Sequence, residues 1–291
     1  MDGESDQRAS SPADIDEITT ALTSADPPTR REAVDAFGVL VRTDPEAAIA
    51  HVDTVADRLD DESLVVARGA AEALAPLARE RPEALVGRVD TVVELLAADA
   101  LDLSFAGGKL LSSLAVECPD GVAASADRLL EILTEDEVPA PESSVPETVE
   151  RNDGRQVVRD VQREALERRQ YVRRTAANVV VAVVEDDPSH LAAPDALGTL
   201  LDDPDPGVVG PALDALGTTA ESDPDAVRPV PDSIRDCLDH DAAAVRARAV
   251  RTLGYLGDES AVPALETVAV EDTDQDVSEL AAETAAFLAD D

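Results

Sequence analysis

Apolar residues recur at helical spacing in paired segments of the chain. The first segment of one such pair has its apolar positions at i, i+3, i+4 and i+7, which lie on one face of an α-helix: Val52, Val55, Ala56 and Leu59. The second segment carries a stripe that is rich in alanine: Leu64, Ala67, Ala70, Ala71 and Leu74. Asp60 to Ser63 interrupt the pattern, and Ser63 can cap the second helix. The pattern predicts two helices that can approach each other closely.

The same pair of helical patterns returns at a fixed interval. The opening prolines are separated by 37, 37, 69 and 36 residues: Pro45, Pro82, Pro119, Pro188 and Pro224. The residues that open the second helices are separated by 37, 37, 69, 36, 37 and 32 residues: Thr29, Val66, Leu103, Val172, Val208, Val245 and Val277. The long step is one period plus an insertion (69 − 37 = 32). A fixed period predicts a repeat array, because no pair can bury its stripes alone.

Three openings of second helices carry a family resemblance: VRRTAANVV at 172–180, VRARAVRTLGYLG at 245–257 and VSELAAETAAFL at 277–288. The unit resembles a HEAT repeat, in particular the acidic, Ala-rich phycobilisome-lyase-type HEAT group, over about residues 14–291. The resemblance implies an all-α fold, a right-handed α-solenoid of about seven HEAT-like helix pairs with one insertion in repeat four.

The resemblance also implies a structural arginine just after the opening residue of the second helix, often bonded to an aspartate in a turn. Arg30, Arg173 and Arg246 occupy this position. Other residues occupy it in the remaining repeats: Ala67, Ser104, Val209 and Ser278. We therefore expect these arginine–aspartate pairs to form an interrupted series.

The domain organisation follows from these landmarks. We expect a disordered tail over residues 1–12, then repeats one to three and the first helix of repeat four over 13–134. An acidic, Pro-rich loop should occupy 135–154, and an Arg-rich helix with repeats five to seven should occupy 155–291. We interpret all repeats as one continuous solenoid domain. Gly107 and Gly108 interrupt a helical stripe, which predicts close packing against bare backbone, and Pro211 predicts a short or kinked helix.

The insertion in repeat four places opposite charges side by side. Residues 135–150 hold six acids, no base and three prolines, whereas residues 151–174 hold eight arginines and four acids, a sum of 8 − 4 = +4. Arg155, Arg159 and Arg163 are spaced i, i+4, i+8 beside a second stripe that contains Val157, Val158 and Val161. The stripes predict one helix over about 155–184, twice the usual length, whose front half projects from the array or folds onto its flank.

Composition indicates a salt-rich cytoplasm. The formal net charge is −39, the acids are spread over every repeat, and Lys109 is the sole lysine. A solvated acidic surface of this kind, with few aromatic residues, is typical of extreme halophiles. No apolar run approaches the ~18 residues of a membrane span, and no signal-peptide pattern opens the chain, so we expect a cytoplasmic protein.

The chain lacks the residue patterns of catalytic chemistry. Cys118 and Cys237 lie in different repeats without a CxxC motif, and His51, His190 and His240 have no His or Cys partner at i+3 or i+4. No phosphate-binding or nucleophile motif occurs. We therefore expect no catalytic residues, no metal and no cofactor. A bilin lyase, suggested by one branch of the resembling family, is disfavoured because the chain has only five aromatic residues.

The function that the sequence favours is a non-enzymatic protein–protein interaction scaffold or adaptor. The candidate contact element is the Arg-rich helix 151–174, with Arg155, Arg159, Arg163, Arg168, Arg169 and Tyr171. In one alternative the arginines merely pair with carboxylates of neighbouring helices or of 135–150. In another, 135–150 masks the helix until a partner protein competes. Nucleic-acid binding through the arginines is a further alternative, which the net charge and the scarcity of stacking aromatics disfavour.

Overall fold

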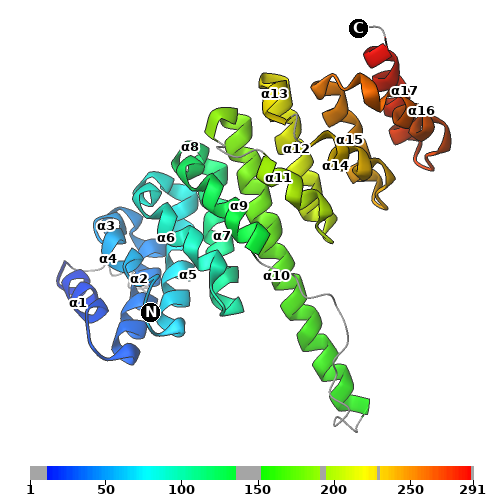
Figure 1. Ribbon diagram of the computed structural model, residues 1–291. Helices are drawn as coiled ribbons and strands as arrows, with labels where there is room; N and C mark the ends of the chain where they lie inside the picture. Colours follow the sequence, from blue (N-terminus) through cyan, green and yellow to red (C-terminus); the bar gives the residue numbers. More distant parts are fainter. Residues whose placement is uncertain (1–11, 136–151, 191–194, 228–229, 290–291) are drawn as a thin grey trace, which may run out of the picture. The chain divides into compact units, whose positions relative to one another are not determined.

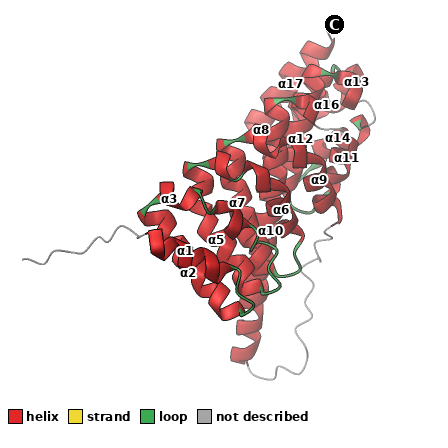
Figure 2. Cartoon of the chain, turned by 90° about the vertical axis from the view of Figure 1, so that its left-hand side faces the viewer, coloured by secondary structure: helices red, strands yellow, loops and turns green. Residues whose placement is uncertain are grey.

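The computed structural model describes residues 12–135, 152–190, 195–227 and 230–289. Every regular element in these ranges is helical (Figure 2). Contacts between residues divide the chain into two compact units, residues 1–122 and 123–291. The expected tail (1–12, apart from Pro12) and nearly all of the expected loop lie outside the described residues. The interpretation of the chain as one continuous domain stays a prediction.

The first unit holds repeats one to three. Its helices are α1 (Pro12–Leu22), α2 (Pro27–Thr43), α3 (Pro45–Ile49), α4 (Val52–Ala56), α5 (Leu64–Glu80), η1 (Pro82–Ala84), η2 (Val86–Arg88), α6 (Val89–Glu94), η3 (Leu95–Ala97), α7 (Leu101–Glu117) and α8 (Pro119–Val122). The long second helices α2, α5 and α7 pack in chain order, each against the next (Figure 1).

The second unit begins within repeat four. Its helices are η4 (Ala123–Ser125), α9 (Ala126–Glu135), α10 (Asn152–Asp186), η5 (Pro188–His190), α11 (Asp195–Thr199), η6 (Leu200–Asp202), α12 (Pro206–Ser222), α13 (Pro224–Val227), α14 (Pro231–Asp236), η7 (Cys237–Asp239), α15 (Ala243–Leu256), η8 (Glu259–Ala261), α16 (Val262–Glu271) and α17 (Gln275–Ala289). Helices α10, α12, α15 and α17 pack successively side by side (Figure 1). Each unit is thus an all-α repeat array, as predicted.

The apolar stripes form the core of the repeats. In repeat two, Val52, Val55, Ala56 and Leu59 of the first stripe are buried. In the second stripe every predicted position is buried except Leu64, which begins α5 and is exposed. Ser63 does stand at the N-cap of α5, but its side chain makes no capping bond. Instead its backbone N–H donates to the Asp61 carboxylate at 3.0 Å.

The first half of most repeats differs from the single predicted helix. In repeat two it consists of α3 and α4, separated at Ala50 and His51. Asp44 accepts a hydrogen bond from the Ala47 N–H, and Pro45 occupies the first turn of α3, where a missing N–H costs nothing. In repeats three and six, Arg88 and Val230 have nearly the same backbone angles as His51, just before α6 and α14 begin.

Gly107, Gly108 and Pro211 do not end or interrupt their helices. Helix α7 runs through both glycines, and a Cβ added at Gly107 would lie 2.6 Å from the Leu95 Cβ, which confirms close packing there. Helix α12 has 17 residues, so the predicted shortening at Pro211 is wrong. Pro211 is buried in the packed face of α12, and this packing outweighs the lost backbone hydrogen bond.

Candidate functional site

Helix α10 is the longest element of the structure. It has 35 described residues, about twice the 14–17 residues of the other second helices, and so spans ~52 Å at ~1.5 Å per residue. The predicted helix over 155–184 is confirmed and extends slightly at both ends. Its back half packs against α9 and α12, while its front half projects beyond both helices (Figure 1).

The described part of the front half is largely exposed. The Val161 side chain is 61% exposed, and Glu164, Glu167 and Arg169 are exposed as well. Helix α10 includes Arg155, Arg159, Val157 and Val158, but their side chains lie outside the described residues. The described part of the front half therefore leaves Val161, Arg163 and Arg169 exposed.

The predicted contact residues share one helix rather than converging from several elements. Arg163 lies 3.8 Å from the Asp160 carboxylate, and Arg168 donates to Glu164 at 2.6 Å, each within α10. Arg169 has no ion-pair partner among the described residues, and Tyr171 is exposed at the edge of the packed half. In the described part of α10, Arg163 and Arg168 thus pair with carboxylates of the same helix, whereas Arg169 does not.

Two arginines further along α10 anchor the helix to repeat five. The buried Arg173 guanidinium donates to the Leu133 carbonyl of α9 at 3.0 Å and to the Asp203 carboxylate. Arg174 makes two hydrogen bonds of 2.8 Å to Asp205. For these two residues the alternative of pairing with neighbouring acids is confirmed.

The predicted structural arginines each join one repeat to the turn of the next. Arg30 in α2 donates twice to Asp61 at 2.7 Å, and Arg246 in α15 donates twice to Asp272 at 2.7 Å. Each guanidinium also donates to a carbonyl of its own turn at 2.9 Å: Arg30 to that of Ser24, and Arg246 to that of His240. With Arg173 and Asp203, they form the inter-repeat ion pairs.

Sequence reasoning missed further arginine–carboxylate pairs between neighbouring repeats. Arg88 donates to Asp53 and Asp57, Arg248 to Asp214, and Arg235 to Asp258. The Arg88–Asp53 and Arg248–Asp214 separations are 35 and 34 residues, close to the repeat period. Opposite charges one period apart lie on adjacent equivalent helices, so this spacing is the signal that could have found them.

Two carboxylates of the inter-repeat ion pairs, Asp61 and Asp272, have a lowered pKa. The Arg246 hydrogen bond lowers the pKa of Asp272 below its usual value, against the effect of burial. Burial alone would raise the pKa of Asp61, but hydrogen bonds from Arg30 and the Ser63 N–H outweigh it, and the net pKa is lowered. Each lowered pKa links the stability of the fold to pH.

We expect Asp272→Asn to destabilise the second unit in a pH-dependent way. At neutral pH the variant should lose about 1.5–3 kcal/mol of unfolding free energy, because the hydrogen bonds to Arg246 lose their charge assistance. A folded-state pKa below the unfolded value of ~3.9 stabilises the fold above that value, and the gain is lost as pH falls through the folded pKa. The difference between wild type and variant should therefore shrink below about pH 4.

Urea unfolding at constant ionic strength, followed by circular dichroism over a pH series, measures this difference. Asp276→Asn on the exposed first turn of α17 is the matched control and should differ little from wild type at any pH. If the difference in unfolding free energy between wild type and Asp272→Asn grew on acidification, it would contradict a lowered pKa of Asp272 in the folded protein.

Neither cysteine forms a disulfide, and two of the histidines lie within hydrogen-bond distance of a neighbouring group. Cys118 and Cys237 are free, and burial with nearby Asp202 and Asp236 raises the pKa of the Cys237 thiol to about 11. The His240 ring accepts the Ala242 N–H at 2.9 Å, and the His51 ring lies 3.2 Å from the Thr19 hydroxyl. Among the described residues, no three His, Cys, Asp or Glu side chains are grouped as metal ligands.

Membrane insertion has no candidate helix in the described part of the chain. None of its helices combines the length and the apolar character that crossing a bilayer requires.

The fold defines a repeat protein of the HEAT and armadillo class. An engineered protein solved as a Northeast Structural Genomics Consortium target is 20% identical, with a TM-score of 0.51, and the match covers 84% of this chain and 98% of that one. A computationally designed armadillo repeat protein for modular peptide recognition is 15% identical, with a TM-score of 0.41, over 94% of this chain and 99% of that one. The comparison with curated proteins found no match.

The family follows from a sequence model. The model of the adaptin N-terminal region matches residues 11–268, which is most of the chain. The chain therefore belongs to the adaptin N-terminal region family. This family is a non-catalytic repeat region typical of protein–protein interaction scaffolds in adaptor complexes.

Proposed function

We propose that this chain is a non-enzymatic protein–protein interaction scaffold whose contact element is the front half of α10. The projection of this half, with Val161 exposed among arginines, carries the proposal. The packed back half of α10 supports the front half, because a helix that is already formed extends without a further nucleation cost. The family membership supports the general role of a scaffold.

The side chains of α10 favour an acidic partner with an apolar groove. Arg155, Arg159, Arg163 and Arg169 supply positive charge, and Arg163 and Arg169 are exposed. An amphipathic helix binds a groove through apolar residues spaced three and four positions apart, and Val161 lies three residues after Val158 and four after Val157. Arginine adds planar, bidentate hydrogen bonds to carboxylates of the partner.

We further propose that the acidic surface is an adaptation to a salt-rich cytoplasm, within a HEAT group of the acidic phycobilisome-lyase type. The net charge of −39 and the single lysine support this proposal. At about 1 M salt the Debye length is ~3 Å, so distant charges hardly interact. Recognition through α10 then depends on close ion pairs and apolar contact.

We expect the triple variant Arg155→Glu, Arg159→Glu and Arg163→Glu to capture its partner at least about tenfold less well than wild type, because each exchange turns an attractive contact into a repulsive one. Pull-down from native lysate at the host's salt concentration, with quantitative mass spectrometry, measures the loss. The matched control replaces Arg31, Arg42 and Arg79, which are exposed on α2 and α5, and makes the same charge change.

The outcomes of this experiment are distinct. A protein lost from the α10 variant and kept by the control would support the proposal and identify the partner. An unchanged set of captured proteins would refute α10 as the contact element. Nucleic acid recovered with wild type and lost from the variant would favour the alternative function.

A further inference from the structure

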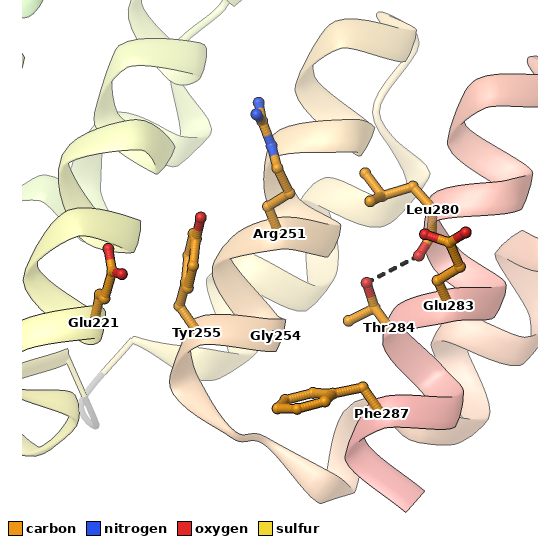
Figure 3. A pocket seen from close by; sticks show the side chains of 8 residues that line it. All are labelled: Glu221, Arg251, Gly254, Tyr255, Leu280, Glu283, Thr284 and Phe287. Carbon is orange, nitrogen blue, oxygen red and sulfur yellow. Dashed lines mark hydrogen bonds between the residues drawn. The ribbon is translucent and has the colours of Figure 1, made fainter.

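A groove of about 510 Å³ lies between the second helices α12, α15 and α17 (Figure 3). Gly254 forms its floor, and the rings of Tyr255 and Phe287 stand on either side of this floor. Leu280 lies toward one end, and Glu221 and Glu283 are at the rim. The groove is remote in sequence from the contact element on α10 and belongs to repeats five to seven.

The aromatic rings in the groove are exposed although aromatic residues are scarce. The chain has three phenylalanines, two tyrosines and no tryptophan, yet Tyr255 is 50% exposed and Phe287 is 59% exposed. The Tyr255 ring is held against α12, because a Cβ added at Gly217 would lie 3.5 Å from its Cδ2 atom. Gly254 leaves the floor bare, since a Cβ there would crowd Thr284 at 3.1 Å.

The charges around the groove favour a cation. Glu221 and Glu283 are exposed, and neither has an ion-pair partner among the described residues. Arg251 also lines the groove, but its guanidinium lies 4.0 Å from the Asp214 carboxylate and points away from Phe287. The faces of tyrosine and phenylalanine rings attract a guanidinium, and the carboxylates can receive its hydrogen bonds.

We propose that this groove binds an extended segment of a partner protein through one arginine side chain flanked by apolar residues. The guanidinium lies against the Tyr255 ring and pairs with Glu221 beside it, while the Phe287 ring packs against a neighbouring apolar side chain of the segment. Its aliphatic stem and an adjacent apolar side chain cover Gly254 and Leu280. This inference goes beyond the proposed function, because it assigns a second surface whose partner has the opposite charge to the partner of α10.

The two tyrosines allow a direct test, since Tyr171 lies on α10 and Tyr255 in the groove. Fluorotyrosine-labelled protein has two ¹⁹F resonances, which Tyr171→Phe assigns. The probe is the peptide acetyl-Gly-Leu-Arg-Leu-Gly-amide, and the control peptides carry Gln or Glu in place of Arg. We expect the Arg peptide to shift the Tyr255 resonance in a saturable manner and to leave the Tyr171 resonance in place.

Variants of the groove locate the binding. Glu221→Gln should weaken binding about tenfold, because it removes the charge that receives the guanidinium, and Phe287→Ala by a similar factor, because it removes the apolar contact to the neighbouring side chain. Glu259→Gln with Glu266→Gln changes two exposed carboxylates outside the groove and should leave affinity within about twofold.

Three results would overturn the inference: no shift of the Tyr255 resonance at millimolar peptide, an equal shift with the Gln peptide, or equal weakening by the control variant. Circular dichroism of each variant confirms that it is folded. None of these results depends on the arginines of α10, so this test and the pull-down can fail independently.

Discussion

Replacing Phe37 with alanine should lower the free energy of unfolding of the first unit by about 3–5 kcal/mol. Phe37 lies in α2, is 0% exposed, and is the largest of the fully buried side chains. Its removal loses the transfer free energy of a ring and leaves a cavity that the close-packed neighbours fill only in part. Urea unfolding followed by far-ultraviolet circular dichroism measures the loss.

The same substitution at Phe287 is the control for Phe37→Ala. Phe287 is 59% exposed at the C-terminal helix α17, so its replacement should cost less than about 1 kcal/mol. Equal losses at the two positions would show that the burial of Phe37 does not determine its contribution. The comparison also separates the effect of Phe287→Ala on groove binding from any effect on stability.

Replacing Arg30 with alanine should cost the first unit about 3–5 kcal/mol. The side chains of Arg30 and Asp61 are 6% and 2% exposed, so the variant would leave a buried carboxylate whose remaining ion-pair partner is Arg58, at the longer distance of 3.5 Å. It would also remove the hydrogen bonds to the Ser24 and Ala25 carbonyls. Urea unfolding at neutral pH measures the loss.

Arg31→Ala is the matched control, one residue along the same helix. Arg31 pairs with Asp35 on the exposed face of α2 at 3.1 Å, and such pairs contribute about 0–1 kcal/mol. The double variant Arg30→Met with Asp61→Leu should recover part of the loss, because no buried charge remains unpaired. A double variant that loses more unfolding free energy than the two single variants lose together would contradict this explanation.

The repeat period and the stripes predicted the course of the chain well, because helix packing in an array depends on apolar residues at regular spacing. The prediction placed α10 over 155–184, within a few residues of its observed bounds. The stripes did not predict the break between α3 and α4. The break falls at Ala50 and His51, and neither residue is a glycine or a proline that would signal the end of a helix. Helix propensity did not predict the full length of α12 either, because tertiary packing overrides the unfavourable effect of Pro211.

The site was only partly predictable. The position after the opening residue of a second helix correctly identified Arg30, Arg173 and Arg246 as structural. The groove escaped sequence reasoning, because Glu221, Tyr255 and Phe287 come from three helices whose relative rotation no local pattern encodes. Within the Arg-rich segment, the sequence alone did not distinguish Arg174, which bonds Asp205 of repeat five, from Arg169, which is exposed.

The inter-repeat ion pairs also bear on how the number of repeats can change. They join repeats one and two, four and five, and six and seven, whereas Ala67, Ser104 and Val209 stand in place of the arginine in repeats two, three and five. Arg88 and Arg248 still pair with carboxylates across the junctions after repeats two and five, but none of these carboxylates is buried. Duplicating or deleting a helix pair at either of these junctions therefore strands no buried carboxylate, and it is less costly there than at a junction that holds a buried ion pair.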